Sequence, residues 1–259
     1  MSFNNIMSVL IKKNNIYSQN GEDGIIQYIF NKLNITNGTF IEFGAWDGIH
    51  LSNTYNLYKN YNWDGIYIES DNDKFTQLSN NFYNNKDRID CVNEYVGFDY
   101  NNNLDTLIEK NSSKRKFDFV SIDVDGLDYF IFEKMEKYLP SVICIEVNAG
   151  HSPLYNNIIS HDVAKDDIGQ SIHVICNLAT VKDYFPLCYT GNLFLIKNKF
   201  KYLFIEDIKS ITEIYIDFLK YLGKDGIIHL KKTFIDNKYF NNFLFNNNIL
   251  EDFVKSRNY

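Results

Sequence analysis

The stretch Thr39–Gly48 reads TFIEFGAWDG, and it decides which fold the chain is expected to have. Its first half, Thr39–Phe43, is a short apolar run that ends in a tight loop with two glycines. A helical pattern, Ser52–Asn60, follows the loop. A strand that leads through such a loop into a helix predicts a βαβ unit, and successive units of this kind predict a parallel sheet.

The same alternation of strand and helix patterns continues on both sides of this stretch. Apolar runs predict further strands at Gly65–Glu69, Ile89–Val92, Phe117–Ile122 and Val142–Val147. Helical spacing of apolar residues predicts helices at Glu22–Leu33, Asp73–Phe82, Leu104–Asn111, Asp128–Tyr138 and about Gln170–Tyr184. We therefore expect an α/β, Rossmann-like fold with helices on both faces of a mostly parallel sheet.

The end of the predicted sheet differs from that of a dinucleotide-binding dehydrogenase. Two apolar runs, Leu187–Tyr189 and Leu193–Ile196, flank the short turn Thr190-Gly191-Asn192. Two strands around so short a turn predict an antiparallel hairpin. The expected sheet has seven strands, five of them parallel and followed by this hairpin, which dehydrogenase folds do not normally carry.

The last part of the chain has a different character. We expect residues 1–199 to form the main domain and residues 200–259 a C-terminal helical appendage. Apolar side chains step by three or four from Ile208 to Leu222, and Gly223 is expected to end that helix. Packing of the appendage on the core is favoured, and a substrate lid or a homodimer surface is the alternative.

Composition excludes several classes of protein. The 259 residues carry a net charge of -7, and 21 Phe and 19 Tyr argue against a disordered chain. No apolar run approaches the roughly 18 residues that span a bilayer, and the first residues do not resemble a secretory signal, so we expect a cytoplasmic protein without a membrane span. The acidity argues against nucleic-acid binding. The four cysteines form no C-x-x-C pair and are expected to be reduced.

Acidic residues gather where the predicted parallel strands end. In a doubly wound sheet, ligands bind outside these carboxyl ends. Such an edge repels phosphates and suits a positively charged ligand with free hydroxyls. Glu69, at the end of the second strand, can accept hydrogen bonds from a ribose diol, which both S-adenosylmethionine and NAD carry. The acidic loops favour S-adenosylmethionine, because its sulfonium and ammonium are positive whereas NAD brings a pyrophosphate.

Five segments resemble one family. They are Tyr17–Ile25, Phe40–Gly48 with Leu51–Thr54, Trp63–Glu69, Ser121–Tyr129 and Cys144–Asn148. In this order they resemble the FkbM-like class I S-adenosylmethionine-dependent methyltransferases, over about residues 17–196. Two positions depart from the family pattern: Ser70 stands where many members have Pro, and Asp125 replaces a Glu.

The resemblance implies roles for individual residues. Gly44 and Gly48 would line the methionine part of the cofactor, with Glu42 and Asp47 near its amine. Glu69 would hold the ribose. The remaining assignments are Asn93 beside the adenine, Asp123 beside the sulfonium, and Gln19 and Glu22 closing over the cofactor.

The resemblance also implies methyl transfer to a hydroxyl oxygen. The acceptor would be small and carbohydrate-linked or nucleotide-activated, such as a bacterial capsule or surface-glycan precursor, including those of the methyl phosphoramidate pathway. His151, Asp125 and Glu146 are the candidate catalytic bases, and Asp128 and His50 are weaker ones. The carboxylates Asp123, Asp125, Asp128 and Glu146 suit Mg²⁺ or Mn²⁺, although we favour a reaction without a metal.

Two other functions remain open at this point. A nucleotide-dependent oxidoreductase or epimerase would bind NAD, but the third glycine of its usual phosphate-binding loop is missing. A non-catalytic, methyltransferase-like subunit would keep the fold and bind no cofactor.

Overall fold

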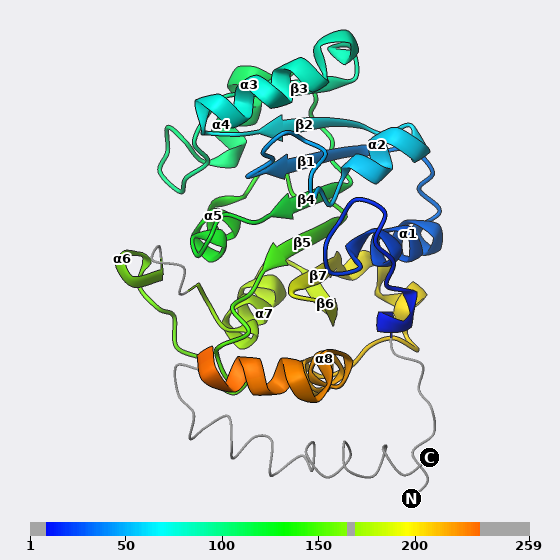
Figure 1. Cartoon of the computed structure of the whole chain (residues 1–259), viewed down its shortest axis with the longest axis vertical. Helices are drawn as coiled ribbons and strands as arrows, with labels where there is room; N and C mark the ends of the chain where they lie inside the picture. The colour runs from blue at the N-terminus through cyan, green and yellow to red at the C-terminus, as the bar shows by residue number, and fades with distance from the viewer. Residues whose placement is uncertain (1–8, 165–168, 234–259) are drawn as a thin grey trace, which may run out of the picture.

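The computed structural model describes residues 9–164 and 169–233. Within these ranges, seven strands form one sheet in the order β3-β2-β1-β4-β5-β7-β6 (Figure 1). The strands are β1 (Thr39–Phe43), β2 (Asp64–Ile68), β3 (Ile89–Val92), β4 (Phe119–Ile122), β5 (Val142–Glu146), β6 (Tyr184–Tyr189) and β7 (Asn192–Lys197). Only β7 pairs antiparallel with its neighbours β5 and β6. The expected fold, a Rossmann-like, mostly parallel sheet that ends in an antiparallel hairpin, is confirmed.

Helices cover both faces of this sheet. The α-helices are α1 (Glu22–Leu33), α2 (Tyr55–Tyr61), α3 (Asn72–Asn81), α4 (Leu104–Asn111), α5 (Asp128–Lys134), α6 (His161–Ala164), α7 (Ile172–Val181) and α8 (Ile211–Thr233). In the described part of the chain, three 3₁₀ turns accompany them, η1 (Val9–Lys12), η2 (Tyr83–Asn85) and η3 (Asn198–Phe204).

The alternation of side chains along the strands divides the core in two. Ile41 and Phe43 of β1 belong to one apolar cluster, together with buried residues of α4, α5, α7 and α8. Phe40 faces the opposite side and belongs to a second cluster with α1, α2, α3, η1 and η3. Successive strand side chains point to opposite faces, so a strand buried on both sides is apolar throughout. This explains why the parallel strands were readable as continuous apolar runs.

The parallel strands place their carboxyl ends along one edge of the sheet. In Figure 1 the arrows of β1, β2, β4 and β5 all point to the left. Their order reverses between β1 and β4, because β1 is followed in sequence by β2 on one side while β4 lies on the other. Loops that leave neighbouring strands in opposite directions open a crevice at such a point.

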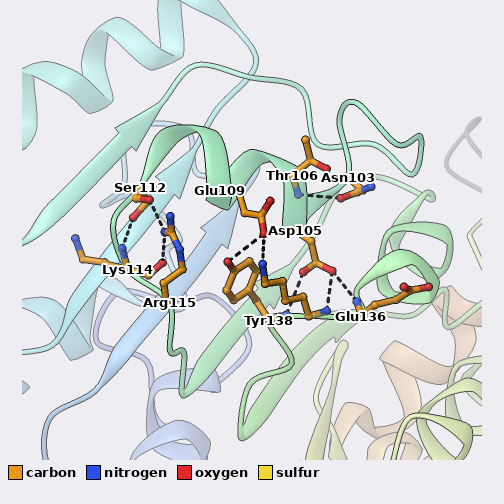
Figure 2. A network of polar contacts seen from close by, with 10 residues as sticks. Asn103, Asp105, Thr106, Glu109, Ser112, Lys114, Arg115, Glu136 and Tyr138 are labelled. Atoms are coloured by element: carbon orange, nitrogen blue, oxygen red, sulfur yellow. Dashed lines mark hydrogen bonds and ion pairs between the residues drawn. The ribbon is translucent and has the colours of Figure 1, made fainter.

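A polar network fixes the chain where it turns back into β5. The Asp105 carboxylate of α4 accepts hydrogen bonds from the backbone N–H groups of Glu136 and Lys137, both at 2.8 Å, and of Tyr138 at 3.1 Å (Figure 2). These bonds draw the backbone out of helical geometry. The predicted helix Asp128–Tyr138 is therefore shorter, and α5 ends at Lys134.

One other helix boundary and one 3₁₀ turn differ from the prediction. The helix expected from Ser52 begins as α2 at Tyr55, because Ser52–Thr54 bind a buried carboxylate described below. The 3₁₀ turn η3 was not predicted, since its sequence lacks a clear apolar period.

The described part of the predicted appendage packs on the core. Four buried side chains of α8 face β6 and α7, namely Ile214, Tyr215, Phe218 and Leu219. The Phe218 ring lies 4.3 Å from the Tyr189 ring, centroid to centroid. Gly223 interrupts the helix with φ 69°, at the position where a helix end was predicted. The predicted domain boundary at residue 199 stays a prediction, and residues 234–259 lie outside the described part.

Within those ranges, no helix combines the length and the apolar composition needed to cross a membrane.

We predict that Phe218→Ala destabilises the whole domain. Truncating a buried aromatic side chain costs about 3 kcal/mol of unfolding free energy. Urea unfolding followed by circular dichroism measures this loss. The control is Tyr221→Ala on the same helix, whose side chain is 55% exposed and which should cost less than about 1 kcal/mol. Equal effects of the two changes would mean that α8 is not anchored through its buried face.

Candidate functional site

A cavity of about 410 Å³ lies at the carboxyl edge of the sheet, where the strand order reverses. This volume is in the range of pockets that hold small molecules. The loops after β1, β2, β3 and β4 line it, and one residue from the segment before α1 joins them. The lining residues are Gln19, Glu42, Phe43, Gly44, Ala45, Trp46, His50, Leu51, Ser52, Asn53, Ile68, Glu69, Ser70, Asp71, Lys74, Glu94, Tyr95, Val96, Asp123, Val124 and Asp125.

Glu42 at the end of β1 organises the wall of this cavity. Its carboxylate accepts hydrogen bonds from the Ser52 hydroxyl at 2.6 Å, from the Asn53 backbone N–H at 2.9 Å and from the Thr54 hydroxyl. Burial raises the pKa of Glu42 above its usual value, and these donors oppose that rise. The residue lines the cavity, but its oxygen atoms already hold the loop that enters α2. The predicted contact with the amine of a cofactor stays a prediction.

Glu69 has the same role one strand further along. One of its carboxylate oxygens accepts a hydrogen bond from the backbone N–H of Trp46 at 2.8 Å, and the other accepts one from Asp71 at 2.8 Å. The side chain is only 5% exposed and borders the cavity. Each carboxylate oxygen has a second lone pair, so Glu69 can still accept bonds from a diol.

The two glycines of the first loop, Gly44 and Gly48, have different roles. Gly44 adopts φ 70°, and a Cβ there would lie 2.5 Å from the backbone oxygen of Asp123. This glycine lets the loops after β1 and β4 approach at the cavity. Gly48 faces away from the cavity, where a Cβ would collide with Phe82 and Leu78.

Asp47 and Asn93 do not line the cavity. The Asp47 carboxylate accepts bonds from the backbone N–H groups of Ile49 and His50, which fixes the turn. Asn93 is exposed and donates to the backbone oxygen of Glu69 at 2.9 Å. The cavity is lined instead by the three residues that follow Asn93 in the chain, Glu94, Tyr95 and Val96.

Asp123, Asp125 and Glu146 come together at the ends of β4 and β5. Ligand atoms of the three lie within 4.8 Å of one another. Asp125 is exposed and, with Asp123, borders the cavity, whereas Glu146 does not line it. Carboxylate oxygens are suitable ligands for Mg²⁺ or Mn²⁺, but acidic groups at such an edge often cluster without a metal. Two of the three predicted bases, Asp125 and Glu146, therefore lie close together at the ends of β4 and β5.

The third predicted base, His151, lies elsewhere. Its side chain is buried, does not line the cavity, and stacks on Tyr155 with ring centroids 5.7 Å apart. The alternative interpretation as a surface histidine is wrong, because the side chain is buried, and the role of His151 as a base stays a prediction. His50, the weaker candidate, does line the cavity.

Asp128 is buried beneath the loop that carries Asp123 and Asp125. Its carboxylate accepts bonds from the backbone N–H groups of Val124 and Gly126, both at 3.1 Å. Burial, and next the charge of Asp123, raise the pKa of Asp128 to about 7. A carboxyl group in this position shapes the loop and does not contact the cavity.

The segment before α1 reaches the cavity through Gln19 but not through Glu22. Glu22 is fully buried and accepts bonds from the Asn20 backbone N–H at 2.7 Å and the Thr190 hydroxyl at 3.1 Å. Asp23 accepts three backbone bonds from Ile16, Tyr17 and Ser18. These two acids therefore fix the loop that presents Gln19.

Sequence reasoning missed several cavity residues, among them Trp46, Lys74 and Tyr95. Trp46 lies inside the glycine loop, between Gly44 and Gly48. Its polar loop setting was the available signal, because an aromatic residue there is not needed for the core. Lys74 and Tyr95 carried no comparable signal, since each stands in a polar stretch without a motif.

No protein-family model and no curated protein matches this chain. Solved structures do resemble it. A Staphylococcus aureus protein described as a candidate caffeoyl-CoA O-methyltransferase is 16% identical, with 71% of this chain and 85% of that chain covered and a TM-score of 0.46.

Two further solved structures have S-adenosylhomocysteine bound. TrmK of M. capricolum is 12% identical, with coverage of 88% and 96% and a TM-score of 0.43. The Podospora anserina methyltransferase PaMTH1 is 11% identical, with coverage of 70% and 79% and a TM-score of 0.45. The fold is defined by the order of the strands, independently of these distant similarities.

We predict that Asp128 makes the stability of the protein depend on pH. The pKa is raised in the fold, so protonation stabilises the native state below about pH 4, and this stabilisation is lost as the pH rises through 7. Between pH 5 and 8 the loss amounts to about 3 kcal/mol. Urea unfolding at several pH values should show this fall in the wild type and a flatter profile in Asp128→Asn. Parallel profiles of the two proteins would contradict the assignment.

Proposed function

We propose that the chain is an S-adenosylmethionine-dependent methyltransferase and that the cavity binds this cofactor. The single observation that carries the proposal is the place of Glu69. This buried acid follows β2, the strand after the glycine loop, and lines the cavity. An acid in this position suits the diol of an adenosine ribose.

The charge of the cavity supports this cofactor over NAD. Six carboxylate residues line it, namely Glu42, Glu69, Asp71, Glu94, Asp123 and Asp125, and Lys74 is the single lysine or arginine among the lining residues. A pyrophosphate would lie among like charges, whereas a sulfonium and an ammonium are stabilised there.

The proposed binding mode follows the order of the strands. The methionine part lies along Gly44, where the backbone is accessible, with Asp123 beside the sulfonium. The ribose contacts Glu69. The adenine lies against Tyr95 and Val96 rather than Asn93, and Gln19 covers the cofactor from the side of α1. Of the assigned residues, Asp47, Gly48 and Glu22 act through the loops that they hold.

The proposed reaction is an in-line transfer. The acceptor oxygen forms a bond to the methyl carbon, and the bond from that carbon to sulfur breaks with its electron pair on sulfur, which gives neutral S-adenosylhomocysteine. The hydroxyl proton passes to a carboxylate. Asp125 is the base that we favour because it borders the cavity, and Glu146 stands beside it. Holding donor and acceptor in line supplies much of the acceleration.

The acceptor that we propose is a hydroxyl of a small carbohydrate-linked molecule, such as a capsule or surface-glycan precursor, modified in the cytoplasm. The same carboxylates disfavour the nucleotide-activated and phosphoramidate acceptors, because their phosphates would be repelled. This part of the proposal rests on the resemblance to FkbM-like enzymes.

Calorimetry with S-adenosylhomocysteine and with NAD tests the proposal. We expect binding of the first and none of the second. Tight binding of NAD alone would favour an oxidoreductase or epimerase. Binding of neither would favour a non-catalytic subunit with this fold.

A second prediction concerns Glu69. Glu69→Ala should weaken S-adenosylhomocysteine binding at least tenfold, because it removes the acceptor for the ribose hydroxyls and the bond to the Trp46 backbone. The matched control is Asp73→Ala, an exposed acid of α3 that does not line the cavity. It should change the affinity less than twofold. Unchanged affinity in Glu69→Ala would remove the residue from its proposed role.

A further inference from the structure

Strained backbone marks the mouth of the cavity. Among the described residues, six other than glycine have a positive φ. Asn34 and Asn62 are helix C-caps, where this conformation is ordinary. Three of the others line the cavity, Trp46 (φ 49°), Leu51 (φ 57°) and Asp125 (φ 53°). A large or branched side chain in this region is disfavoured, and such strain concentrates at ligand sites.

The side chains at these strained positions are the ones presented to the cavity and to solvent. Trp46 is 41% exposed and Leu51 is 42% exposed, whereas the other tryptophan, Trp63, is 1% exposed. A glycine at either position would relieve the strain. Neither the backbone geometry nor the packing of the core therefore requires a large side chain at position 46 or 51.

The indole of Trp46 is held in place from several sides. The His50 ring packs against it edge-on, with centroids 5.2 Å apart, and the Lys74 ammonium lies 4.9 Å from its centroid. The backbone N–H of Trp46 donates to Glu69 at 2.8 Å. An exposed aromatic ring with a fixed orientation is a platform for a ligand.

The charges near this platform limit what it can bind. Asp125 borders the same cavity, and Asp123 and Glu146 lie close to it. Carboxylates accept hydrogen bonds from hydroxyls and repel phosphates. A suitable ligand has a C–H face for the indole and Leu51, hydroxyls for Asp125, and no negative charge.

We propose that Trp46 and Leu51 form the acceptor platform and that the acceptor is an uncharged sugar ring, bound with its C–H face on the indole and a hydroxyl toward Asp125. This proposal rests on the proposed methyltransferase function. It makes Trp46 a specificity-determining residue. Through the bond from its backbone to Glu69, the platform is fixed by the same carboxylate that is assigned to the ribose.

The test uses the full chain saturated with S-adenosylhomocysteine. Saturation-transfer NMR measures binding of a panel of methyl hexosides and methyl N-acetylhexosaminides, with glucose 1-phosphate, UDP-glucose and catechol as competing classes. We expect at least one neutral glycoside to bind, and more tightly than either phosphate-containing sugar. Trp46→Ala should weaken that glycoside at least tenfold and S-adenosylhomocysteine less than threefold.

Two variants separate the platform from a folding defect. Trp46→Phe keeps an aromatic face and should weaken the glycoside less than Trp46→Ala does. Tyr100→Ala removes an aromatic side chain that is 83% exposed and does not line the cavity, and it should change nothing.

Four results would overturn the proposal while leaving the methyltransferase function intact: no neutral glycoside binds although S-adenosylhomocysteine does, a phosphate-containing sugar binds more tightly, catechol binds in place of the glycosides, or Trp46→Ala binds the glycoside normally. Failure of S-adenosylhomocysteine itself to bind the wild type would overturn both proposals.

Discussion

The cavity depends on two buried carboxylates that hold backbone in place. Glu42 and Glu69 lie at the ends of neighbouring parallel strands. Glu42 accepts hydrogen bonds from hydroxyl and N–H groups of the loop before α2, and Glu69 accepts them from two backbone N–H groups. Buried carboxylates are costly unless they are hydrogen-bonded, so the loops must close around them. This constraint keeps the glycine loop open toward the sheet edge. The same loop presents Trp46 and Leu51 to the cavity.

From this arrangement the chemistry of the cavity follows. Gly44 lets two loops meet, and Asp123 and Asp125 line the same cavity as Glu42 and Glu69. The result is a crevice with excess negative charge and an aromatic mouth. A cation is stabilised in it and a phosphate is repelled. The proposed donor and the proposed uncharged acceptor both satisfy this condition.

Much of the fold was predictable because strands buried on both faces are apolar throughout and helices show their period. The helices Glu22–Leu33 and Leu104–Asn111 and the strand Ile89–Val92 were placed with their observed bounds. The helix boundaries that moved were set by contacts distant in sequence, such as the bonds from Asp105 to residues 136–138.

The site was predictable in its strand-end acids and less so in detail. Sequence shows that a polar residue follows a strand, but not whether its side chain points into a cavity or binds its own loop. Asp47 and Asp128 bind their own loops, and His151 lies against Tyr155. Trp46 was missed although it stands in a polar loop, because its exposure also depends on a backbone conformation that the sequence does not disclose.

The most direct test of the central claim is a crystal structure of the protein with S-adenosylhomocysteine. The account predicts density in this cavity, with the ribose hydroxyls in hydrogen-bonding distance of Glu69 and the sulfur beside Gly44 and Asp123. A cavity that stays empty at saturating ligand, or a dinucleotide that binds there with its pyrophosphate among the carboxylates, would contradict it.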